Sequence, residues 1–235
     1  MNGRIAVVTG GTRGIGAAIA DRLAEDGYTV IAAARRPPAQ TQKQVSFVAC
    51  DVADASSVHA LFAPLRRVDA LVCCAGLAGA NRLDTADDTL WHAIIGTNLH
   101  GTYHCCRAAL GLLQDRTGRV VTIASVLGLR GVADQTAYCA AKHGVVGFTR
   151  ALALALAPRG ITANAVCPGW VDTEMAASRF GELGITAADA AAGLPTGRIA
   201  TPAEVAGVVA FLLSPAAASI TGHALPIDGG GLALP

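Results

Sequence analysis

The sequence has few charged and few aromatic residues. Charged side chains make up 15% of its 235 residues and aromatic ones 4%, and 18 Lys and Arg nearly balance 17 Asp and Glu, which leaves a net charge of +1. Because nucleic-acid-binding proteins normally carry a clear basic excess, this balance argues against a nucleic-acid partner.

Long apolar runs are also missing, although 52% of the residues are hydrophobic. A membrane-spanning helix needs about 18 or more uninterrupted apolar residues, and no segment approaches that length. The N-terminal sequence MNGRIAVVTGG has a short apolar run that glycines end, which is unlike the core of a secretory signal peptide. We expect a cytoplasmic protein with no membrane partner, and the apolar excess then needs another explanation.

The seven cysteines form no CxxC pair, and their number is odd. Several lie in apolar runs, which is typical of buried thiols in a reducing compartment. A zinc site is the alternative, because His100 and His104 would share one face of a helix beside Cys105 and Cys106. No carboxylate or further histidine close by completes a ligand set, so we expect no metal.

Short apolar runs alternate with helix-like stretches along the whole chain. Strands are predicted at Arg4–Thr9, Thr29–Ala34, Val45–Cys50, Ala70–Cys74, Arg119–Ala124, Thr162–Cys167 and Ala224–Ile227. Several are continuously apolar, as parallel strands are when both faces of their sheet are covered. The pattern predicts an α/β fold, a single Rossmann-type domain over residues 1–235. Its doubly wound parallel sheet would have about seven strands and helices on both faces.

The connection between the second and third predicted strands is short. It runs from Arg35 to Gln44 and contains Pro37 and Pro38. A helical crossover between parallel strands usually needs a dozen or more residues, and proline disfavours a helix there. We expect an extended connection that leaves this flank of the sheet thinly covered.

Two predicted helices, Gly101–Leu113 and Thr136–Ala157, have apolar residues around much of their circumference. A helix that is apolar on all sides must be buried, either inside the fold or against another subunit. If the two helices lie side by side, they would form a subunit interface.

A glycine-rich segment follows the first predicted strand and opens a helix expected over Ala17–Glu25. It reads TGGTRGIG over residues 9–16, with glycines at 10, 14 and 16. These glycines allow a sharp turn and a close approach of the backbone to a pyrophosphate, and the helix N-terminus supplies amide donors. Its place between the first strand and the first helix predicts dinucleotide binding.

The residues after the second predicted strand indicate which dinucleotide is bound. A fold that binds NAD usually carries Asp or Glu there, to hold the ribose 2′-hydroxyl. This chain has Arg35 and Arg36 instead, and Arg13 in the glycine-rich loop. Guanidinium groups suit a 2′-phosphate, so we predict NADP(H). The alternative is that Arg35 and Arg36 are only solvated loop charges.

Several motifs together resemble the short-chain dehydrogenase/reductase family over nearly the whole chain. They are TGGTRGIG at 9–16, CDV at 50–52, AG at 75–76, TNLHG at 97–101, Ser125, YCAAK at 138–142 and PGWVDT at 168–173. Ser125 and Tyr138 lie 13 residues apart, which is also usual for that family. The resemblance implies an NADP(H)-dependent oxidoreductase that interconverts a ketone and a secondary alcohol.

Four residues carry the expected chemistry. Tyr138 and Lys142 are four positions apart on one predicted helix and therefore share a face. A neighbouring ammonium can lower the pKa of a phenol by about 1–3 units, so we expect Tyr138 to be the general acid and Lys142 to tune it. Ser125 would orient the carbonyl oxygen. By resemblance, Lys142 also holds the nicotinamide ribose, and Asn98 completes a proton relay through a water molecule.

The resemblance also implies a set of cofactor contacts. With the loop and arginine residues included, they are Gly10, Thr12, Arg13, Gly14, Ile15, Gly16, Arg35, Arg36, Asp51, Val52, Ala75, Gly76, Tyr138, Lys142, Pro168, Gly169, Val171 and Thr173. In one departure, Cys73 and Cys74 stand where the family usually has two asparagines. Since a thiol hydrogen-bonds poorly, we expect a local loss of sheet rigidity rather than of catalysis.

The segment from about 170 to 195 resembles the family's mobile substrate lid. The expected substrate wall consists of Val126, Leu127, Leu129, Gln135, Trp170, Met175 and Phe180. Because nearly all of these are apolar, we predict a largely hydrophobic ketone as substrate. The chain looks especially like bacterial ketoreductases that act on 3-oxoacyl or polyketide thioesters. Arg130 and Arg179 would then meet a phosphopantetheine phosphate.

Two other functions stay open at this point. One is an NAD-dependent secondary alcohol dehydrogenase, which the missing acidic residue after the second strand disfavours. The other is a non-catalytic dinucleotide sensor, which would tolerate the loss of Tyr138 or Lys142. The resemblance further implies a homodimer through the two apolar helices, or a homotetramer with a second contact at His223–Pro235.

Overall fold

Seven parallel strands form one sheet at the centre of the protein. The computed structural model describes residues 3–38, 44–85 and 88–234, and the strand order is β3-β2-β1-β4-β5-β6-β7. The strands are β1 (Arg4–Thr9), β2 (Tyr28–Ala34), β3 (Val45–Ala49), β4 (Ala70–Cys73), β5 (Arg119–Ile123), β6 (Thr162–Pro168) and β7 (Ala224–Ile227). The predicted fold class is confirmed, and no predicted strand end is wrong by more than one residue.

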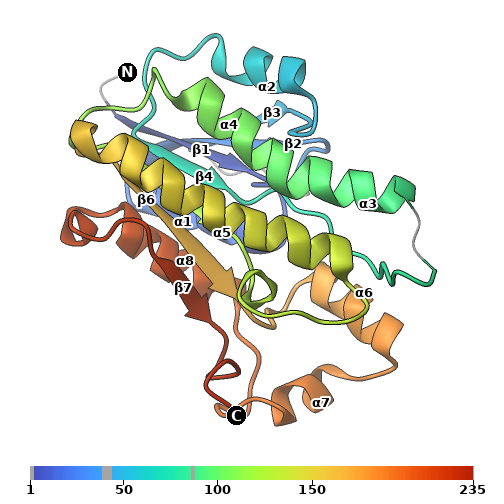
Figure 1. Ribbon diagram of the computed structural model, residues 1–235. Coiled ribbons are helices and arrows are strands. Elements are labelled where there is room, and N and C mark those ends of the chain that lie inside the picture. Colours follow the sequence, from blue (N-terminus) through green and yellow to red (C-terminus); the bar gives the residue numbers. More distant parts are fainter. Residues whose placement is uncertain (1–2, 39–43, 86–87, 235) are drawn as a thin grey trace.

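Helices cover both faces of the sheet (Figure 1). One face packs against α1 (Gly14–Glu25) and α8 (Pro202–Leu213). The other packs against α2 (Ala55–Phe62), α4 (Gly101–Ala109) and α5 (Thr136–Leu156). The helix α3 (Asp88–Ile95) continues into α4 through a π-helical turn, Gly96–His100. Short 3₁₀ turns lie at Val126–Gly128, Ala157–Arg159 and Pro215–Ala217.

Burial on both faces explains the continuous apolar strands. Every residue of β4, β5 and β6 is buried, whereas β3 at the sheet edge is at most half-buried. This exposed edge agrees with the thin cover expected on that flank. Of the connection expected to be extended, residues 39–43 lie outside the described part of the chain.

The structure distinguishes between the two kinds of burial expected for the helices α4 and α5. Both lie in front of the sheet in Figure 1, but within one chain each buries only one face. On their outer faces Leu154 is 78% exposed, and Tyr103 and Leu110 are each more than 40% exposed. Of the two alternatives, burial inside the fold on all sides does not apply to these helices, and burial against another subunit stays a prediction.

Two further findings concern the cysteines and the membrane. All seven cysteines are free thiols and five of them are buried, as the composition predicts. Within the described residues, no helix combines the length and the apolarity that a membrane crossing demands.

Candidate active site

The strand order reverses between β1 and β4, the position at which a doubly wound sheet is expected to form a binding crevice. From β1 the chain builds β2 and β3 on one side of the sheet, and it then returns to place β4 on the other side. In open parallel sheets, ligands bind outside the carboxyl ends of the strands at such a point. The glycine-rich loop follows the carboxyl end of β1. Ala75 and Gly76 follow that of β4, and Ser125 follows that of the neighbouring β5.

The glycine-rich loop packs too tightly for any other residue at two positions. A Cβ on Gly16 would lie 2.1 Å from the carbonyl oxygen of Gly10, and a Cβ on Gly10 would lie 2.8 Å from the backbone nitrogen of Ala75. Gly10 and Gly14 also have positive φ angles, 68° and 52°. This bare backbone cradle at the N-terminus of α1 fits a dinucleotide pyrophosphate.

Thr9 joins the ends of β1 and β4. Its Oγ1 accepts hydrogen bonds from the backbone nitrogens of Cys74 (3.2 Å) and Ala75 (3.3 Å). Gly10 N donates to Ala33 O on the other side, over 2.7 Å. The main chain at the crevice is therefore tied across β1, β2 and β4 although cysteines replace the usual asparagines.

Asn98 lies in the π-helical turn between α3 and α4 and is 1% exposed. Its side-chain amide accepts from Leu77 N and donates to Leu77 O, each over 2.8 Å. A Cβ on Gly76 would lie 3.2 Å from Asn98 Oδ1 and 3.9 Å from Lys142 Nζ. Asn98 thus holds the chain just after β4, and Asn98 and Lys142 both lie close to Gly76. π-Turns occur frequently at functional sites.

Ser125, Tyr138 and Lys142 come together beside the end of β5. Ser125 Oγ accepts from Leu127 N over 3.1 Å and so caps the 3₁₀ turn. Tyr138 and Lys142 project from the first turns of α5, and Lys142 Nζ lies 5.4 Å from the centre of the Tyr138 ring. Lys142 is 4% exposed and donates to Ile123 O over 2.8 Å. The predicted catalytic residues therefore share one location.

Burial controls the proton affinities of this group. It raises the pKa of Tyr138 to about 12, although a hydrogen bond with Ser125 lowers it in part. It lowers the pKa of Lys142 to about 8. In this structure burial holds the pKa of Tyr138 above its usual value, and the expectation that Lys142 tunes it stays a prediction. A phenol that keeps its proton at neutral pH suits a proton donor.

Gly128 is a site residue that sequence reasoning missed. A Cβ there would lie 2.7 Å from the carbonyl oxygen of Lys142. The 3₁₀ turn that carries Ser125 at its start can therefore pack directly on α5. A glycine three positions after Ser125 was the available signal.

The remaining predicted cofactor residues lie at or after the carboxyl ends of β2, β3 and β6, and some make unexpected contacts. Arg35 and Arg36 follow β2 and are exposed. Asp51 Oδ1 accepts from Ala53 N over 3.0 Å. Gly169 is required for packing, since a Cβ there would lie 3.0 Å from Asp228 Cβ.

The segment predicted as a lid contains two helices, α6 (Glu174–Leu183) and α7 (Ala187–Ala192). Thr173 caps α6, and Thr186 with Asp189 forms a capping box on α7. This segment has a small hydrophobic cluster, formed by Trp170, Ala176, Phe180, Ile185 and Ala190 together with Ile199, which follows the segment. The weak periodicity in the sequence therefore reflects two short helices rather than a loop.

Two predicted roles in or near this segment need correction. Phe180 is 8% exposed and lies against Trp170, with ring centres 4.9 Å apart and ring planes tilted by 47°, so it packs inside this segment instead of lining the substrate wall. Arg179 pairs with Asp134 and Glu182 and its side chain is only 13% exposed, which leaves no free guanidinium for a phosphate. Met175, also predicted to line the substrate wall, is 43% exposed.

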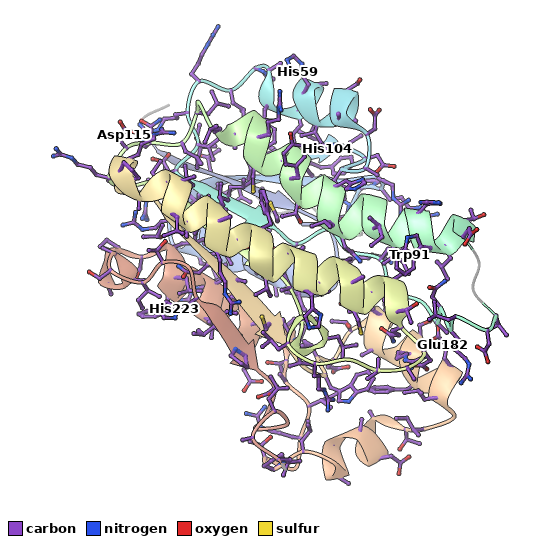
Figure 2. All side chains as sticks on the ribbon, viewed as in Figure 1. His59, Trp91, His104, Asp115, Glu182 and His223 are labelled. Carbon is purple, nitrogen blue, oxygen red and sulfur yellow. The ribbon has the colours of Figure 1, made fainter. Side chains whose placement is uncertain are left out.

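The histidines considered for zinc do not gather into a ligand set. His104 Nδ1 hydrogen-bonds to Val52 O over 3.1 Å, and the His100 and His104 rings are 6.5 Å apart. Figure 2 shows His104 on α4. In residues 3–38, 44–85 and 88–234, no group of three or more His, Cys, Asp or Glu side chains could hold a metal ion.

The doubly wound sheet, the glycine cradle and the grouped Ser, Tyr and Lys side chains define a dinucleotide-binding oxidoreductase. The family model described as enoyl-(acyl carrier protein) reductase matches residues 10–231. The chain belongs to the short-chain dehydrogenase/reductase family, whose members act on C=O and CH–OH groups.

Relatives and solved structures support this assignment along the whole chain. The chain is 39% identical to the 3-oxoacyl-(acyl-carrier-protein) reductase of Vibrio harveyi, covering 98% of both chains. It is 40% identical to a putative ketoacyl reductase of Streptomyces coelicolor, covering 98% of this chain and 97% of the relative. A variant of the actinorhodin polyketide ketoreductase, solved with NADPH, has a TM-score of 0.90 and 38% identity, covering 97% of both chains.

Replacing Gly16 by alanine tests the glycine cradle. The new Cβ would collide with the Gly10 carbonyl, so we expect binding of NADPH and NADH to weaken at least about tenfold, as measured by nucleotide fluorescence. Gly181→Ala is the matched control, because a Cβ there meets nothing within 4 Å. It should keep nucleotide binding and stabilise α6 by up to about 1 kcal/mol. Equal binding by both variants would contradict the cradle.

Replacing Lys142 by methionine tests the cost of burying the amine. The pKa of Lys142 is about 8 in the folded chain and 10.5 ordinarily. Between these two pH values the unfolded chain binds more protons at Lys142 than the folded chain, so the wild-type free energy of unfolding rises with pH. We expect the Met variant to be more stable at pH 7, by on the order of 1–3 kcal/mol. Urea unfolding across this range should show that advantage shrinking, and a constant difference would be the contrary result.

Proposed function

We propose that the protein is an NADP(H)-dependent ketoreductase that acts on a largely hydrophobic or 3-oxoacyl ketone. The observation that carries the proposal is the grouping of Ser125, Tyr138 and Lys142 at the end of β5, next to the glycine cradle. The names of the relatives support the substrate class, since they are 3-oxoacyl-(acyl-carrier-protein) and ketoacyl reductases.

The arginines near the glycine cradle support NADP(H) as the cofactor. Arg35 and Arg36 follow β2 and are exposed, and Arg13 lies in the loop. A 2′-phosphate accepts paired hydrogen bonds from guanidinium groups, whereas an NAD site places a carboxylate after this strand. The structural relative solved with NADPH agrees with this choice. We propose the other residues of the predicted set, from Gly10 to Thr173, as further cofactor contacts.

In the proposed mechanism, Tyr138 supplies the proton. A bound nicotinamide would supply the hydride to the carbonyl carbon or accept it in reverse. Tyr138 donates its hydroxyl proton to the carbonyl oxygen, and its raised pKa keeps that proton in place until charge develops. Ser125 donates a hydrogen bond to the same oxygen. Lys142 would hold the ribose and stabilise the tyrosinate. Asn98 keeps the chain after β4 in position and would complete a proton relay through a water molecule and Lys142.

The substrate would lie between the 3₁₀ turn after β5 and the lid. We propose Val126, Leu127, Gln135, Trp170 and Met175 as its contacts. Val126 and Leu127 follow Ser125 directly, and Gln135 precedes α5. The lid over residues 170–195 belongs to the single domain and would cover the substrate.

Replacing Tyr138 by phenylalanine tests the proposal. Turnover of 3-oxoacyl thioesters, aryl ketones and cyclic ketones would be followed by NADPH oxidation, and catalytic efficiency with NADPH should exceed that with NADH. The loss of the proton donor should lower turnover by about 10²–10⁴-fold and leave NADPH affinity unchanged. Tyr28→Phe is the control, because that hydroxyl accepts a hydrogen bond from Arg4 at the amino ends of the strands, away from the site. Full activity in the Tyr138→Phe variant, or a preference of the wild type for NADH, would refute the proposal.

We also propose that α4 and α5 form the interface of a homodimer, which can assemble further into a homotetramer. The support is their exposed outer face, with Tyr103, Leu110 and Leu154 more than 40% exposed. A cytoplasmic location and the absence of a nucleic-acid partner stay predictions.

Replacing Leu154 by glutamate tests this interface. A charge in the centre of an apolar interface is costly to bury, so light scattering after gel filtration should show the wild type as a dimer or tetramer and the variant in smaller species. Leu83→Glu is the control, since Leu83 is 80% exposed and belongs to neither helix. A wild-type monomer would contradict the interface.

A further inference from the structure

The lid helix α6 begins in contact with the glycine-rich loop. Arg13 Nη1 donates to Glu174 Oε2 over 3.2 Å, and this ion pair joins the loop before α1 to the first residue of α6. Next to it, a Cβ on Gly14 would lie 3.4 Å from Thr173 Cγ2. The ion pair therefore connects the cofactor loop with the lid, and the space beside Gly14 is closed by Thr173.

The Arg13–Glu174 pair can open at little cost. The two side chains are 72% and 81% exposed, and exposed ion pairs of this kind contribute little free energy. Glu174 has a second source of stabilisation, because a carboxylate in the first turn of a helix interacts favourably with the helix dipole. Thr173 Oγ1 caps α6 by accepting from Ala176 N over 3.3 Å, so the start of the helix does not depend on Arg13.

The same guanidinium is a ligand for the 2′-phosphate in the proposed function. A phosphate and a carboxylate on one arginine are competing acceptors, and the phosphate carries the larger charge. Arg35 and Arg36 have no carboxylate partner among the described residues, so Arg13 is distinct from them in being paired. Glu174 therefore acts on one of the three arginines that favour NADP(H).

We propose that Glu174 competes with the 2′-phosphate of NADP(H) for Arg13 and is thereby a specificity-determining residue. The inference rests on the proposed NADP(H) preference. Binding of a 2′-phosphate would draw Arg13 away from Glu174 and leave the first residue of α6 held only by its own helix. Binding of a nucleotide without that phosphate would leave the pair intact. Occupancy of the 2′-phosphate subsite is in this way linked to the attachment of the lid.

The test compares two nucleotides that differ only in the 2′-phosphate. Isothermal titration at low ionic strength would measure adenosine 2′,5′-bisphosphate and AMP against the wild type and Glu174→Gln. Loss of the competing carboxylate should tighten the bisphosphate about two- to fivefold relative to AMP, the range expected for an exposed ion pair. In an Arg13→Gln background the same substitution should have no effect on that ratio. High salt should shrink the effect.

Glu182→Gln is the matched control, because Glu182 lies on the same helix but pairs with Arg179. Figure 2 shows it on α6. It should leave the ratio of the two affinities unchanged. An unchanged ratio in Glu174→Gln, or an effect that persists without Arg13, would overturn the proposal. A wild-type protein that binds the bisphosphate no more tightly than AMP would instead refute the NADP(H) preference itself, so the two failures are distinguishable.

Discussion

Direct backbone contact between the glycine-rich loop and the end of β4 is the constraint on which the site depends. The contact requires the absence of a side chain at Gly10, and Thr9 fixes it because its side-chain Oγ1 accepts hydrogen bonds from two backbone nitrogens. It sets where Gly76 lies, and Asn98 and Lys142 lie beside Gly76. The nucleotide cradle and the catalytic residues are therefore parts of one packed unit instead of two sites that meet by chance.

The fold and the grouping of the catalytic residues were predictable from sequence, because both follow from local patterns. Continuous apolar strands report burial on both faces, and the i, i+4 spacing of Tyr138 and Lys142 reports a shared helix face. What was not predictable depends on three-dimensional surroundings. Arg179 looked like a free surface charge but pairs with Asp134, which lies far away in the sequence. Phe180 looked like a wall residue but packs in the small hydrophobic cluster of the lid segment.

The proton affinities were also beyond the reach of sequence. Spacing alone showed that the amine of Lys142 would lie near the phenol of Tyr138, and it suggested that this amine would set the pKa of the phenol. Desolvation is set by everything that packs around both groups, and here it raises the pKa of Tyr138 and lowers that of Lys142. Burial thus strengthens electrostatic contacts in the site and also raises the pKa of Tyr138, so Tyr138 keeps its proton until the substrate develops negative charge.

The π-helical turn at Gly96–His100 has a consequence for the evolution of the chain. Such a turn is equivalent to one extra residue inserted in an α-helix, and each residue rotates a helix by about 100°. Deleting a single residue there would restore regular α-helix and swing α3 around its axis relative to α4. Asn98 would then turn away from Leu77, whose backbone it now holds at both polar atoms. The irregular turn therefore fixes the rotational phase between a helix that packs on the sheet and a helix that borders the site.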